Sequence, residues 1–248
     1  AMLEHIELKL LAGYPIETDG GLIYQPKIKD IVDIGEEKYR QYLGLLLFDT
    51  DLIEIKDKEL QRVEMDEFTT FDFLYFLSVL NENTRSLVED SLRFFFRKDI
   101  VTLNDYRFCV GHFGEQKFIT RDNYNYIKKV LIKMNFLKEL EEEEEIEFGN
   151  ELARQWYLEA KKVEKNRPKP KPQINLQSII SAMMWRTNKT TEQILDMTVY
   201  QLHDGYHRLF LIDECLGLRD GLYHGTVDKN KINPNDLNWA KIIEFNNQ

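Results

Sequence analysis

A change in composition between residues 139 and 173 constrains the organisation of this chain more than any other feature of its sequence. Seven of the nine residues from Glu139 to Glu147 are glutamate, and three of the six prolines lie in the alternating run Pro168 to Pro172. Neighbouring like charges repel, and alternating proline and lysine favour an extended, solvated conformation. The sequence therefore predicts an N-terminal domain over residues 1–138 and a C-terminal domain over 174–248. An acidic helix and a Pro/Lys spacer over 139–173 would join them.

The pattern before the spacer mixes strands and helices. Apolar residues alternate at Ile6, Leu8 and Leu10, which predicts a strand, and a turn at Gly20-Gly21 would return it as a second strand at 22–24. A second hairpin is expected from 107–110 and 117–120. Apolar residues at helical spacing predict further helices, with a possible break at Gly35. These helices span residues 26–46, 66–80, 84–97 with Asn83 or Thr84 as cap, and about 122–134, where Tyr124, Ile127, Val130, Leu131 and Met134 would face inward.

The pattern after the spacer is almost wholly helical. It predicts a short helix at 176–185, a helix start at Thr190, and a long amphipathic segment from about 194 to 216. Gly217, Gly221 and Gly225 are expected to interrupt that segment. Trp239 is expected to pack the tail back on the helices. The predicted fold class is thus α+β and predominantly helical, with small antiparallel hairpins in the N-terminal unit and a helical C-terminal unit.

Composition and charge argue against several classes of function. Of the 248 residues, 43 are acidic and 33 are basic, so the formal charge is -10. Phosphate neutralisation dominates nucleic-acid affinity, and nucleic acid is therefore not expected as the main partner. The longest apolar run, Tyr42 to Phe48, is far shorter than the roughly 20 residues of a membrane-spanning helix, and no signal-peptide pattern precedes it. No membrane association is expected. Cys109 and Cys215 have no partner at motif spacing, which favours reduced thiols in a cytosolic compartment.

One segment has an enzyme-like pattern. His203 and His207 stand at i and i+4, the spacing at which the two histidines of His-Glu-x-x-His peptidases bind zinc. Asp204 is one methylene shorter than the glutamate base of that motif, and Gly205 disfavours the helix. Phosphate-binding loops, dinucleotide fingerprints and the serine elbow have no match. The sequence therefore predicts no catalytic residue, no metal site and no cofactor, and a metal-dependent hydrolase using His203 and His207 is retained only as a third hypothesis.

Aromatic residues make up 12% of the chain, and several tyrosines, including Tyr200, Tyr206 and Tyr223, lie on the C-terminal helical segment. Tyrosine and tryptophan are favoured at protein interfaces because they cover area while keeping a polar tip. They also fill cores, and the helical period is the same in both cases. The pattern leaves both interpretations open.

Four segments carry a resemblance to a known family. They are 21–39, 118–135, Ser178 to Trp185, and Ile194 to Leu209, which contains the box Met-Thr-Val-Tyr-Gln-Leu at 197–202. Together they resemble tail-region proteins encoded by phages of Gram-positive bacteria, and the likeness spans most of the chain. The box is similar to a helix start in tail assembly chaperones, which coat the aggregation-prone tape-measure protein until the tail tube polymerises around it.

The resemblance implies a non-enzymatic assembly protein in the host cytoplasm, with a phage tape-measure or other tail protein as its partner and possible self-association. It supplies no catalytic residue. Trp185, Tyr200, Leu202, Tyr206 and Leu209 match the family pattern, so some of them are expected to contact partner chains and the others to be core. The second hypothesis is a structural or adaptor component of the virion tail or neck, because neighbouring tail and neck genes encode small proteins without chemistry.

Overall fold

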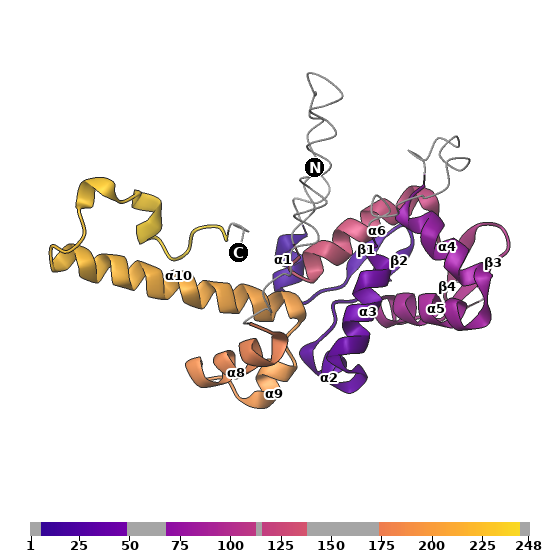
Figure 1. Cartoon of the computed structure of the whole chain (residues 1–248), viewed down its shortest axis with the longest axis horizontal. Coiled ribbons are helices and arrows are strands. Elements are labelled where there is room, and N and C mark those ends of the chain that lie inside the picture. The colour runs from indigo at the N-terminus through magenta and orange to yellow at the C-terminus, as the bar shows by residue number, and fades with distance from the viewer. Residues whose placement is uncertain (1–5, 49–67, 113–115, 138–173, 244–248) are drawn as a thin grey trace, which may run out of the picture.

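The structure is a computed structural model that describes residues 6–48, 68–112, 116–137 and 174–243 (Figure 1). The glutamate-rich run and the Pro/Lys spacer lie outside these ranges. The division into two domains joined by residues 139–173 therefore stays a prediction. What the structure does describe is how the elements on either side of that segment pack.

The chain begins with a helix where a strand was expected. α1 spans Glu7–Leu11, and the hairpin that follows consists of β1 (Ile16–Thr18) and β2 (Gly21–Ile23), with Ile16 opposite Ile23. The predicted strand over Ile6 to Leu10 is thus wrong, while the turn and the returning strand are confirmed. The reason is that Ile6 and Leu10 are also four residues apart, and a helix buries both of them while Leu8 stays 80% exposed.

Helices make up the rest of the first half. α2 (Ile28–Ile34) and α3 (Glu36–Leu46) are separated at Gly35, whose φ of 89° lies in the region that glycine tolerates. α4 spans Thr70–Leu80 and α5 spans Glu82–Phe96. The cap of α5 is Asn81, whose side chain accepts a hydrogen bond from the backbone N–H of Thr84, so the expected cap at Asn83 or Thr84 is late by two or three residues.

A three-stranded antiparallel sheet follows α5. It consists of β3 (Ile100–Leu103), β4 (Arg107–Val110) and β5 (Lys117–Ile119), in that order. The sequence analysis predicted β4 and β5 but not β3. α6 (Arg121–Met134) then packs its predicted inward positions into the core, and all five are buried.

The C-terminal part is helical, as predicted, but the single segment expected from about 194 to 216 is divided between Leu195 and Val199, because Thr198 caps a new helix. It contains α8 (Leu176–Arg186), α9 (Thr191–Leu195), α10 (Val199–Tyr223) and two 3₁₀ turns, η4 (Lys229–Lys231) and η5 (Pro234–Leu237). α10 runs through Gly217 and Gly221, so the expected interruption there is wrong. Only Gly225, with a φ of 68°, lies at the end of the helix. Each glycine costs about 1 kcal/mol of helix stability relative to alanine, which a 25-residue helix tolerates.

Figure 1 shows α10 projecting away from the body of the molecule, with α8 and α9 beside its first half and the tail beside its second half. One hydrophobic core includes residues from both sides of the spacer, and Ile179, Met183, Ile194, Val199 and Leu202 are its C-terminal members. The fold is α+β and mostly helical, with two small antiparallel sheets among the described residues. Within those ranges, no helix combines the length and apolarity needed to span a membrane.

Candidate protein-interaction surface

The start of α10 is fixed to the N-terminal part by its backbone. The N–H of Val199 donates to the carbonyl of Pro26 at 3.1 Å, and the N–H of Ile28 donates to the carbonyl of Met197 at 2.9 Å. Thr198 and Gln201 form a capping box there, because each side chain accepts a hydrogen bond from the other residue's N–H. The base of α10 is therefore held rigidly.

An ion cluster reinforces this joint. Lys27 and Lys29 both reach the same carboxylate oxygen of Asp196 at 2.8 Å. Hydrogen bonds from Lys27 and Lys29 lower the pKa of Asp196 to about 2. The cluster is partly exposed, so its contribution to stability is small and falls with added salt. It orients α9 against α2 more than it stabilises the fold.

The five residues of the predicted partner-binding set occupy different environments. Leu202 is fully buried in the core, and Leu209 packs against the same core. Tyr200 is half-buried, with its ring edge-on to Phe136 at 5.4 Å between centroids. Tyr206 is half-buried and contacts Phe210, at 5.2 Å between ring centroids. Trp185, at the end of α8, is 88% exposed. Only Trp185 offers most of its side chain to a partner.

The two histidines share one face of α10, as their spacing requires, but that face packs on Phe136. The rings of His203 and His207 lie 5.7 and 5.3 Å from the Phe136 ring, at 14° and 20° to its plane. Phe136 follows α6 with a φ of 56°. Nothing in the local sequence marks it as a residue that contacts α10, and the sequence analysis did not name it.

Burial sets the charge state of this pair. Loss of hydration, with a smaller effect of His207, lowers the pKa of His203 to about 4. Burial also lowers the pKa of His207, while Asp204 opposes that shift. Both imidazoles are therefore neutral near pH 7. No group of three or more histidine, cysteine, aspartate or glutamate residues within the described ranges is arranged to hold a metal ion. The face of α10 that carries His203 and His207 is instead occupied by the ring of Phe136.

The second half of α10 exposes large apolar side chains. Beyond Leu209, Phe210 is 52%, Leu216 is 51% and Tyr223 is 88% exposed. Only Cys215 is buried in this half of the helix. Phe210, Leu216 and Tyr223 were not in the predicted partner-binding set, although their apolar character on a helix with a wet face is the signal that points to them. We call these three side chains and Trp185 the arm surface, although they do not share one helix face, since Phe210 and Leu216 are about 120° apart around α10.

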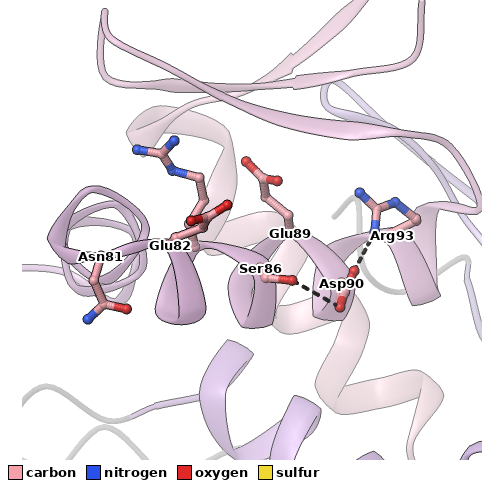
Figure 2. A pocket seen from close by; sticks show the side chains of 7 residues that line it. Asn81, Glu82, Ser86, Glu89, Asp90 and Arg93 are labelled. Atoms are coloured by element: carbon pink, nitrogen blue, oxygen red, sulfur yellow. Dashed lines mark hydrogen bonds and ion pairs between the residues drawn. The ribbon is translucent and has the colours of Figure 1, made fainter.

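A polar hollow lies along α5 and is built from structural contacts (Figure 2). Arg85 donates to the carbonyl of Ser78, Glu89 accepts from the N–H and hydroxyl of Thr102, and Asp90 pairs with Arg93. Arg85 connects α5 to α4 and Glu89 connects it to β3, while the Asp90–Arg93 pair lies within α5. The hollow therefore offers few uncommitted polar groups to a ligand.

Comparison with protein families finds that residues 165–244 match the model described as the YomV second domain. This is a phage-type domain, and the match supports a phage origin for the chain. The matched range includes α8, α9, α10 and the tail, and therefore the whole arm surface. Neither the curated proteins nor the solved structures contain a match.

Proposed function

We propose that this protein is a non-enzymatic phage assembly protein, and specifically a tail assembly chaperone that binds the tape-measure protein in the host cytoplasm. The observation that carries the proposal is the arm surface. Trp185 and Tyr223 are each 88% exposed on helices that lie inside the matched phage-type range. Nucleic acid, membrane and cofactor have no part in it.

The physical basis is the cost of exposing apolar area. Burying apolar surface stabilises a complex by about 25 cal/mol per Å², and rigid aromatic anchors lose little entropy on binding. A tape-measure protein is long and helical, so it can present rows of apolar side chains to such anchors. The acidic net charge of -10 keeps the chaperone itself dispersed.

Point variants test this proposal better than deletion of the C-terminal part. Deleting residues 174–248 would remove Ile179, Met183 and Leu202 from the shared core and unfold more than a binding surface. We therefore use the double variant Trp185→Ser/Tyr223→Ser. It is co-expressed with the product of the longest helical open reading frame of the same genome, which is the candidate tape-measure protein.

We expect the wild-type protein to keep that partner in the soluble fraction and to co-purify with it. The double variant should reduce co-purification by about tenfold or more, because both anchors are lost. The matched control is Tyr14→Ser, which removes a 63% exposed ring that is not part of the arm surface and should leave co-purification unchanged. Equal aggregation of the partner with and without the wild-type protein would rule out the chaperone assignment.

A structural component of the virion tail or neck is separated from a chaperone by mass spectrometry of purified particles. A chaperone acts during assembly and should be absent from mature virions. Stoichiometric copies in the particle would favour the structural component instead.

A further inference from the structure

The second half of α10 has an apolar seam that is distinct from the arm surface. Leu211, Cys215, Leu218 and Leu222 are spaced by four, three and four residues. That spacing places them on one face of a helix and is the spacing of the apolar seam of a coiled coil. Cys215 is 1% exposed, and the three leucines are half-buried. Such a seam fits another α-helix with a matching apolar row.

What covers this seam is not an α-helix but the tail of the chain, residues 226–243, which runs back along α10 in Figure 1. The tail consists of η4, η5 and connecting segments, and most of its side chains are exposed. Its turns are capped locally, by the side chain of Asp228 on the N–H of Asn230 and that of Asn233 on the N–H of Asn235. Its half-buried side chains include Val227, Ile232 and Leu237, which are five residues apart, so the tail covers the seam without the regular apolar row of a helix.

The tail is held through its backbone carbonyls. Arg208 donates to the carbonyls of Trp239 and Lys241 at 2.8 and 2.7 Å. Cys215 and Arg219 both donate to the carbonyl of Leu237, each at 3.0 Å. The two arginines border the seam and bind neutral oxygens, although a guanidinium binds a carboxylate more strongly. A helix with an acidic edge would satisfy them better than the tail does.

We propose that the seam of Leu211, Cys215, Leu218 and Leu222 is a docking site for an amphipathic helix of the partner, with an apolar row and an acidic edge. The tail is then a placeholder that the partner helix displaces. This inference rests on the proposed function, and it identifies this seam as the part of α10 that would bind the tape-measure protein. In the free protein, the tail keeps the seam out of water and limits its association with other apolar surfaces.

Gly221 provides a way to lift the tail without shortening the chain. Its carbonyl accepts from the N–H groups of Thr226 and Val227, and a methyl group at position 221 would lie 2.5 Å from Cγ2 of Val227. Gly221→Ala should therefore push the tail away from α10. Gly217→Ala is the matched control, since it makes the same change one turn earlier, where nothing lies within 4 Å. Arg208→Gln is a second variant that releases the tail and leaves the turn intact.

The first measurement is hydrogen exchange of the full-length proteins. Residues 226–243 should exchange roughly tenfold faster or more in Gly221→Ala and Arg208→Gln than in wild type, and at the wild-type rate in Gly217→Ala. The second is binding of the apolar dye 8-anilinonaphthalene-1-sulfonate, which should rise severalfold in the same two variants only. Unchanged exchange in both variants, or a freed tail without dye binding, would overturn the placeholder proposal.

Binding of the candidate tape-measure protein then separates this inference from the proposed function. Tighter binding by Gly221→Ala than by Gly217→Ala supports the placeholder. Equal binding by wild type and both glycine variants overturns it and leaves the chaperone assignment standing. If no form binds that partner, the chaperone assignment fails, while exchange and dye binding still decide whether the tail covers an apolar docking seam.

Discussion

Replacing Leu202 by alanine is expected to lower the free energy of unfolding by about 2–5 kcal/mol, the range for a buried leucine whose cavity collapses only in part. Leu202 has no exposed surface, and it belongs to the core that elements on both sides of the spacer share. The measurement is a urea titration followed by far-ultraviolet circular dichroism. The loss should appear as a lower midpoint with an unchanged slope.

The control for this change is Trp185→Ala, on the same C-terminal helical part. Its side chain is 88% exposed, so the free energy of unfolding should change by about 0.5 kcal/mol or less. When equal amounts of folded protein are compared, partner binding should change in the opposite order. Trp185→Ala should weaken it more than Leu202→Ala does. A large loss of stability for Trp185→Ala together with a small one for Leu202→Ala would show that the two roles have been exchanged.

Acid is expected to destabilise the protein through His203. Burial lowers its pKa in the folded state to about 4 from an ordinary value of 6.5, so between these pH values the unfolded chain binds a proton that the folded chain does not. The stabilisation is complete above pH 6.5 and is lost as the pH falls toward 4. At 1.36 kcal/mol per pH unit, the loss approaches about 3 kcal/mol. Urea titrations at half-unit steps from pH 7.5 to 4 measure it.

The variant His203→Gln removes this proton uptake. Its stability at pH 7 should be somewhat lower, because the stacking on Phe136 is lost, but its decline between pH 6.5 and 4 should be shallower than that of wild type. His224→Gln is the control, because His224 is exposed at the end of α10 and should leave the wild-type curve unchanged. Parallel curves for wild type and His203→Gln would mean that His203 is not the group responsible.

Most helices of this fold could be predicted from periodicity, because a long amphipathic helix repeats its apolar positions often enough to exclude a strand. α6 is the best example, with all five predicted positions buried. The segment at Ile6 to Leu10 is too short for that test, and only its packing decided between strand and helix. β3 was missed, and its role became visible through its pairing with β4, in which Ile100 lies opposite Val110.

The candidate site was less predictable than the fold. Trp185 and Leu202 carry the same signal in the sequence, yet one is almost wholly exposed and the other has no exposed surface. The helical period gives the direction in which a side chain points from the helix axis. It does not show whether another element of the fold lies in that direction. Phe136 was missed for the same reason, since its contact with His203 and His207 joins segments that are distant along the chain.

The sequence by itself determined much of the local structure of the C-terminal part: the helix start at Thr190, the 3.6-residue period of α10, and a predominantly helical fold. These features depend on neighbours within a few residues. The tertiary structure alone decided which face of α10 is buried by the body, which is exposed and which is covered by the tail. Those faces depend on contacts such as Arg208 with Trp239 and Val199 with Pro26, whose partners are 31 and 173 residues apart, and no local pattern encodes them.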